Sequence, residues 1–181
     1  MQGNSQEVLK SPNWTLSDIE GNQHTLYNYL DSGYTVIVNI ASVAADPVTG
    51  QGWLYVTEGI LNDIYNSYGP GYFGSKEIMV FLIEHDPNTT LADIQGTGPN
   101  TYGDWDMVVD CPIIQCDTIT NIYPLDETTD YPYPANYIIC KDRSMVRTGW
   151  FASQALINEA GNCPVPLFNN DAALSKINTP V

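Results

Sequence analysis

The chain has 181 residues, of which 43% are hydrophobic, so it can form one domain with a sizeable core. Acidic residues outnumber basic ones by 21 to 6, which gives a formal net charge of −15. Phosphate backbones and anionic lipids repel a chain this acidic, so we expect neither nucleic acid nor a membrane surface as a partner. Because no apolar run reaches about 18 residues, we also expect no membrane insertion.

The composition favours a compartment outside the cytosol. Lys and Glu are few, whereas Asn, Thr, Tyr and Gly are abundant, which is more typical of extracellular proteins. Residues 1–7 are polar and do not form a signal peptide. The alternatives are a cytosolic protein and an exported one whose signal was removed, and we expect the latter, in an extracellular or periplasmic location. With only two histidines and no Cys-x-x-Cys pair, a zinc site is not expected.

Residues 1–12 are expected to form a flexible arm, residues 13–163 one domain and residues 164–181 a tail. The domain begins with a predicted hairpin over residues 14–26, because turn-forming residues at 20–22 separate two short segments of strand-like alternation. A single helical turn is expected at 26–30.

A β-α-β unit follows the hairpin. Residues 35–41 are nearly all apolar and β-branched, which predicts a strand covered on both faces. From Trp53 onwards, apolar residues recur at gaps of three and four, which predicts one amphipathic helix over 53–68 that ends at Gly69. Residues 77–84 predict a second buried strand, parallel to the first through a right-handed crossover.

The second half of the chain is predicted to alternate between short elements and turns. Residues 85–110 are expected to be mainly irregular, with a helical turn at 89–94. The later elements are a strand at 112–115, a helical turn at 118–123, a strand pair at 136–140 and 144–149, and a helix at 152–161 that stops at Gly161.

This order of elements resembles the thioredoxin superfamily, in its peroxiredoxin-related branch. The residues that carry the resemblance are Val36–Ala41, Glu77–Glu84, Cys111–Asp117 and Tyr133–Ile139. Secreted thioredoxin-like domains of Bacteroidetes-type bacteria share further segments, which here are Leu61–Gly69, Met79–Glu84 and Gly103–Trp105. The resemblance implies an α/β fold with a central mixed sheet flanked by helices and preceded by an N-terminal β-hairpin. A weaker likeness, through Ile37–Ser42, is to glutathione peroxidases.

The chain departs from that family at its catalytic positions. In active members the first strand delivers a Cys-x-x-Cys motif to a helix N-terminus, which stabilises the thiolate, and a cis-proline faces the motif. The matching positions here are Ala44, Ala45, Asp46 and Pro47, and the facing proline is Pro134. The resemblance therefore implies a redox-inactive protein without catalytic residues or cofactor.

A partner-binding groove is the function that such a scaffold can retain. In active relatives the backbone beside the facing proline pairs with an extended peptide, and this contact needs no cysteine. We expect a groove lined by Val43, Tyr131 and Tyr133, and a protein partner or self-assembly. The alternative is that the proline only shapes the fold. Aromatic residues in or beside loops, such as Tyr55 and Trp105, are either a contact surface or ordinary core.

The resemblance also places the cysteines. Cys140, at the end of a strand, and Cys163, after the last helix, are expected at the pole opposite to the degenerate motif, where a disulfide can join them. If the stretch between Cys111 and Cys116 is extended, their Cα atoms lie about 16 Å apart, too far for a disulfide. A relocated redox centre at Cys111 or Cys116 remains the alternative that would make the chain an oxidoreductase.

Acidic loop residues suggest a third alternative, a calcium-stabilised adhesive domain. Asp104, Asp106 and Asp110 supply the oxygen ligands that Ca²⁺ prefers, although no established calcium-loop pattern is present. A solvated acidic face explains the same residues. From the sequence we therefore favour a non-enzymatic, disulfide-containing interaction or surface-assembly module.

Overall fold

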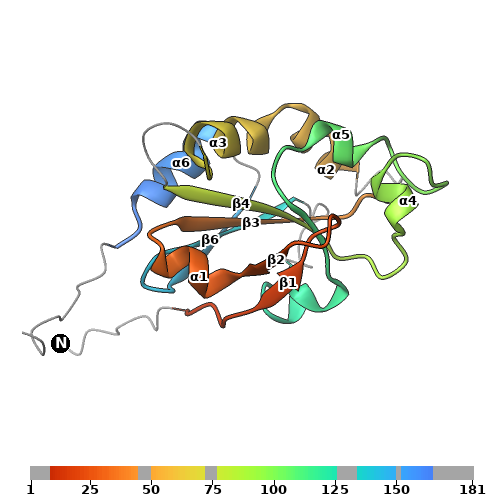
Figure 1. Cartoon of the computed structure of the whole chain (residues 1–181). Helices are drawn as coiled ribbons and strands as arrows, with labels where there is room; N and C mark the ends of the chain where they lie inside the picture. The colour runs from red at the N-terminus through yellow and green to blue at the C-terminus, as the bar shows by residue number, and fades with distance from the viewer. Residues whose placement is uncertain (1–8, 45–49, 72–76, 126–133, 150–151, 165–181) are drawn as a thin grey trace, which may run out of the picture.

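The computed structural model describes residues 9–44, 50–71, 77–125, 134–149 and 152–164 (Figure 1). The strands are β1 (Thr15–Ser17), β2 (Gln23–Thr25), β3 (Thr35–Ala41), β4 (Ile78–Glu84), β5 (Ile113–Gln115), β6 (Ala135–Ile139) and β7 (Met145–Thr148). The helices are α1 (Leu26–Asp31), α2 (Gly50–Thr57), α3 (Ile60–Tyr68), α4 (Leu91–Ile94), α5 (Trp105–Val108) and α6 (Ser153–Gly161), with a 3₁₀ helix η1 at Asp117–Asn121.

Five strands form one mixed sheet in the order β5-β4-β3-β6-β7. β3, β4 and β5 are parallel, whereas β6 and β7 run antiparallel to their neighbours. All seven residues of β3 and all seven of β4 are buried, as their continuous apolar sequences predict. The separate pair β1-β2 is the expected hairpin. The predicted fold class is therefore confirmed.

The core has two layers, one on each face of the sheet (Figure 1). On one face, α2, α3, α5 and α6 pack over side chains such as Ile37 and Val80. On the other face, α1, the hairpin and η1 cover side chains such as Val38 and Phe81. Because side chains alternate along a strand, each central strand contributes to both layers.

The predicted helix over 53–68 is wrong in one respect, because the structure has two helices there. Gly59 adopts a φ of 76°, in the left-handed region, and separates α2 from α3. Glycine reaches this conformation without the steric cost that a side chain imposes, so it can end one helix and begin another. The first helix also begins earlier than predicted, at Gly50.

Residues 85–110 are more ordered than predicted. Thr90 and Asp93 form a capping box at the start of α4, and Asp93 also accepts a hydrogen bond from the Asn100 backbone at 3.0 Å. Gly96 has a φ of 69°, and a Cβ there would lie 2.8 Å from the Asp104 backbone. The segment 85–110, called the excursion below, is thus closed by short-range hydrogen bonds and a close backbone approach. The composition did not reveal either.

Candidate functional site

The segment that the resemblance aligns with the Cys-x-x-Cys motif, called the degenerate turn below, follows the end of β3. Val43 and Ala44 follow the last buried strand residues, and both are buried, at 1% and 7% exposure. Ala44 presents a methyl group and therefore no nucleophile. Ala45, Asp46 and Pro47 lie outside the described residues, and so do Tyr131 and Tyr133 of the expected groove. The Val43 side chain packs in the core, so only its backbone is available to a groove.

Pro134 lies at the same end of the sheet as this turn. It immediately precedes β6, in which Ala135 pairs with Ile40 of β3. Because β6 is antiparallel to β3, the start of β6 and the end of β3 meet at one edge. Pro134 and the residues that follow β3 therefore lie at the same edge of the sheet.

A buried carboxyl group holds the backbone of this turn. Glu84, at the end of β4, is 1% exposed. One of its oxygens accepts a hydrogen bond from the Val43 backbone N–H, and the other accepts one from the Asp86 N–H at 2.7 Å. Burial raises the pKa of Glu84 to about 7, although the two backbone hydrogen bonds oppose that effect. Burial also lowers the pKa of the adjacent His85.

Sequence reasoning did not single out Glu84. The available signal was its position, because a carboxyl group ends a strand whose other six residues are all apolar. A carboxyl at that place must either reach solvent or find donors. Here it finds two backbone donors on loops that follow neighbouring strands.

A second polar group lies beneath α2. Asn39 donates to Asn136 Oδ1 at 2.8 Å, and the two residues are paired across β3 and β6. Asn136 Nδ2 in turn donates to the Tyr55 hydroxyl at 3.2 Å and to the Gly149 carbonyl at 3.1 Å. Burial raises the pKa of Tyr55. This network connects the sheet to α2 and β7 without any redox-active group.

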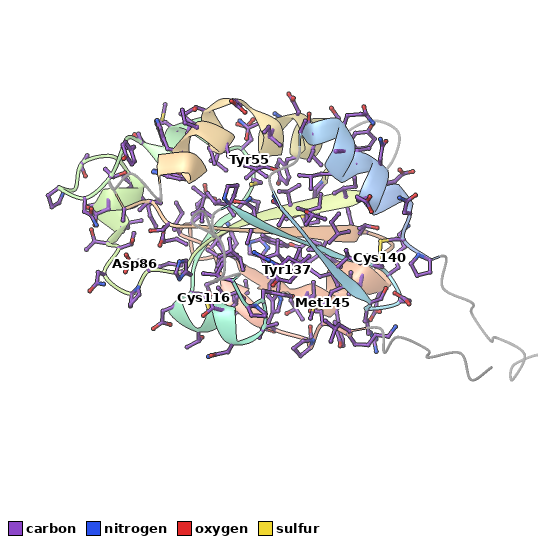
Figure 2. The ribbon with its side chains drawn as sticks, turned by 180° about the vertical axis from the view of Figure 1, so that it is seen from behind. Tyr55, Asp86, Cys116, Tyr137, Cys140 and Met145 are labelled. Carbon is purple, nitrogen blue, oxygen red and sulfur yellow. A yellow bond between two sulfur atoms is a disulfide. The ribbon has the colours of Figure 1, made fainter. Side chains whose placement is uncertain are left out.

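Two cysteines form a disulfide at the other end of the molecule. Cys140 follows β6, Cys163 follows α6, and their Cα atoms are 5.3 Å apart. Figure 2 shows Cys140 at the opposite end of the molecule from Asp86, which follows β4 next to the degenerate turn. The expected disulfide is therefore present, away from the motif. Intrachain disulfides are typical of oxidising compartments.

The other two cysteines are free. Residues 113–115 between them form strand β5, so Cys111 and Cys116 cannot approach each other by folding back. Cys111 is 3% exposed, and burial raises the pKa of its thiol to about 12. Such a thiol is almost entirely protonated near neutral pH and is a poor nucleophile. Cys116 is partly exposed, and its Sγ lies 3.5 Å from the Thr118 hydroxyl.

The calcium candidates have other roles in the structure. Asp104 caps α5 by accepting a hydrogen bond from the Met107 N–H at 3.1 Å, and Asp110 accepts one from Asn66 at 2.6 Å. Asp106 lies in the first turn of α5. In the described part of the chain, no three His, Cys, Asp or Glu side chains are placed to share a metal ion.

Two aromatic residues proposed for a contact surface belong to the core instead. Tyr55 and Trp105 are both fully buried. Trp53 lies 5.4 Å from Trp105, centroid to centroid, in an edge-to-face arrangement, and its ring also approaches Gly103. Their positions in or beside loops did not reveal this burial. Tyr55 points from α2 to Asn136 in the sheet, and Trp105 packs against Trp53.

None of the helices in the described ranges has the length and apolar character needed to cross a bilayer.

Comparison with known proteins finds likeness in structure but not in sequence. No family model matches the chain, and no curated protein matches it in sequence. The thioredoxin domain of a thiol-disulfide oxidoreductase from Bacteroides vulgatus matches with a TM-score of 0.57 and 15% identity, covering 87% of this chain and 98% of that domain.

Two further solved structures give the same result. An exposed lipoprotein thioredoxin from Streptococcus pneumoniae matches with a TM-score of 0.52 and 15% identity, over 83% of this chain and 99% of that one. A thioredoxin-like protein from Bacteroides caccae matches with a TM-score of 0.52 and 14% identity, over 84% of this chain and 48% of that one. The chain therefore has a thioredoxin-like fold.

Proposed function

We propose that the chain is a redox-inactive module of thioredoxin-like fold, exported from the cytosol, that acts by binding a protein partner or by self-assembly. The observation that carries this proposal is Ala44 at the end of β3. The strand delivers a buried methyl group to the turn where the resemblance implies a thiolate. One fold supports many functions, so the missing chemistry at the site weighs more than the likeness to oxidoreductases.

The remaining thiols give little support to the alternative of a relocated redox centre. The Cys111 thiol is buried with a raised pKa, and strand β5 separates it from Cys116. The Cys140–Cys163 disulfide supports export, because such bonds persist in oxidising compartments. One of the structurally similar proteins is described as an exposed lipoprotein.

The direct test is a disulfide-reductase and peroxidase assay on the full chain, with free thiols counted in the same sample. We expect no turnover above the uncatalysed rate and two free thiols per chain. Cys111→Ser and Cys116→Ser variants are assayed in parallel. Turnover that disappears in either variant would make the chain an enzyme with a relocated nucleophile, and the proposal would be wrong.

The interaction role is tested by sedimentation velocity over a range of protein concentrations. We expect reversible self-association that weakens in Tyr133→Ala, whose side chain belongs to the proposed groove. The matched control is Tyr102→Ala, because Tyr102 is 45% exposed on the excursion between β4 and β5. Equal weakening by both variants would contradict a groove at Tyr133. A chain that stays monomeric would exclude self-assembly.

A further inference from the structure

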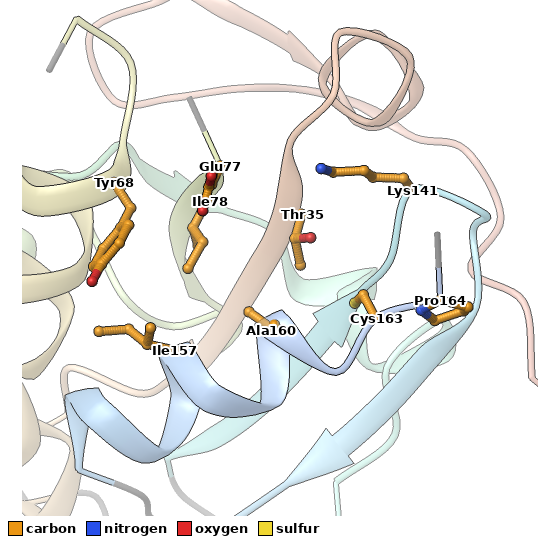
Figure 3. Close-up of a pocket in the computed structure, with 10 residues that line it drawn as sticks. Thr35, Tyr68, Glu77, Ile78, Lys141, Ile157, Ala160, Cys163 and Pro164 are labelled. Carbon is orange, nitrogen blue, oxygen red and sulfur yellow. The ribbon is translucent and has the colours of Figure 1, made fainter. Parts of the chain in front are cut away.

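A cavity of about 340 Å³ lies at the pole opposite to the degenerate turn, between the starts of β3 and β4 and the ends of α3 and α6 (Figure 3). We call it the far-pole pocket. Its volume falls within the range of about 300–1,000 Å³ that is usual for small-molecule sites. The floor is apolar and consists of Ile78, Ile157, Ala160 and the ring of Tyr68.

Two charges of opposite sign stand at the opening. Lys141 extends from the turn after β6, and Glu77 lies on the other side, just before β4 (Figure 3). Neither side chain forms an ion pair or a hydrogen bond with a described residue. By contrast, Lys10 and Arg143 are both ion-paired, with Asp142 and Asp31 respectively. Within the described ranges Lys141 therefore has no ion-pair partner, on a chain whose formal net charge is −15.

A threonine hydroxyl also lies at the pocket. Thr35, the first residue of β3, is 4% exposed and lines the cavity. Its backbone N–H donates to the Glu77 carbonyl at 2.7 Å, but its hydroxyl makes no hydrogen bond within the described residues. The Thr35 hydroxyl is not one of the fully buried polar atoms that lack a partner, so it is accessible and can hydrogen-bond to water or to a polar ligand group.

We propose that the far-pole pocket binds a zwitterionic amino acid with an apolar side chain. Lys141 would pair with the carboxylate, Glu77 with the ammonium group, and the apolar floor would cover the side chain. A zwitterion has no net charge, so the strongly acidic surface does not repel it as it would repel a simple carboxylate. The Thr35 hydroxyl supplies a further hydrogen bond to the ligand's polar end.

The disulfide keeps the walls of the pocket in place. Lys141 directly follows Cys140, and Cys163 itself lines the cavity. The bond therefore fixes the turn that carries the cation to the end of α6. A pocket that is held in its binding geometry loses less conformational entropy when it binds. This inference is independent of the function proposed for the other pole.

The test is a titration of the ¹⁵N-labelled full chain with L-leucine, followed by amide chemical shifts. We expect saturable shifts at Thr35, Lys141 and Ile157. Leucinamide, which lacks the carboxylate, and 4-methylpentanoate, which lacks the ammonium group, should each bind more weakly. Lys141→Gln should weaken leucine binding about tenfold, since a hydrogen bond to a charged group contributes about that factor. Arg147→Gln removes a positive charge on β7, outside the pocket and its turn, and should leave the affinity unchanged.

A second variant fills the pocket without disturbing the core. A Cβ at Gly161, which lines the cavity, would meet no heavy atom within 4 Å, and the residue does not require a positive φ. Gly161→Leu should therefore fold normally and lose leucine binding. The proposal is overturned if no saturable shift occurs at about 10 mM leucine, a concentration that reveals even millimolar affinity. Binding that survives Gly161→Leu, or an analogue that binds as tightly as leucine, would also overturn it.

Discussion

Replacement of the buried Glu84 by glutamine should remove a pH dependence from the stability of the fold. The carboxyl group is 1% exposed, and both of its oxygens accept backbone hydrogen bonds from Val43 and Asp86. Glutamine has a similar shape but does not titrate. It also offers only one oxygen, so one of the two backbone donors loses its acceptor, at a cost of about 1–3 kcal/mol.

The sign of the pH dependence follows from where the proton binds. Burial raises the pKa of Glu84 from 4.5 to about 7, so in that interval the folded chain holds a proton that the unfolded chain releases. The contribution of Glu84 to the free energy of unfolding therefore falls as pH rises from about 4.5. Above about pH 7 the decrease is complete. At about 1.4 kcal/mol per pKa unit, the loss amounts to about 3 kcal/mol.

The assay is urea unfolding of the wild type and Glu84→Gln between pH 4 and 8, followed by tryptophan fluorescence, with the disulfide intact. Subtraction of the two free energies of unfolding cancels the titration of the other groups. We expect the difference, wild type minus variant, to fall by about 3 kcal/mol across this range. Glu159→Gln, at an exposed position of α6, serves as the control and should show no such change. A difference for Glu84→Gln that stays constant within about 1 kcal/mol would refute the reasoning.

Two further predictions concern the cysteines. The Cys140→Ser/Cys163→Ser variant should lose about 3 kcal/mol in urea unfolding, because the bond closes a loop with a sequence separation of 23. A loss below about 1 kcal/mol would show that this bond constrains the unfolded chain very little. Iodoacetamide should alkylate Cys116 in the folded protein and reach Cys111 only after unfolding, because burial raises the pKa of the Cys111 thiol to about 12. Equal alkylation rates, measured by mass spectrometry, would contradict the buried position of Cys111.

The two central strands and the hairpin could be predicted because the sequence of each fits one type of local structure. Residues 35–41 and 78–84 carry mostly apolar side chains on both faces, and only a strand in the middle of a covered sheet buries both. The hairpin was predictable from its turn residues. The position of Cys140 and Cys163 at the end of the sheet opposite to the degenerate turn was predictable from the direction of the strands. That direction follows from the order of elements once the fold is assumed.

The features that sequence patterns missed depend on contacts between distant segments. Gly59 fits an amphipathic helix by its spacing, and only its left-handed φ in the structure separates α2 from α3. Tyr55 is buried because α2 packs on the sheet, where the Tyr55 hydroxyl meets Asn136. Trp105 is buried against Trp53 of α2, and the sequence around neither residue indicates its contact. Glu84 acquires its role from backbone donors at Val43 and Asp86, and the first of these lies 41 residues away in the chain.

The two poles of this sheet can change independently. β3 and β4 are each seven residues long, so the degenerate turn and the far-pole pocket are separated by about 20 Å of close-packed strand. Over such distances the effects of substitutions on stability are usually additive. A substitution at one end therefore imposes no change at the disulfide end. Glu84 holds the turn through backbone hydrogen bonds, which persist whatever side chain stands at position 44. A substitution at position 44 therefore need not alter the far-pole pocket, which the Cys140–Cys163 disulfide borders.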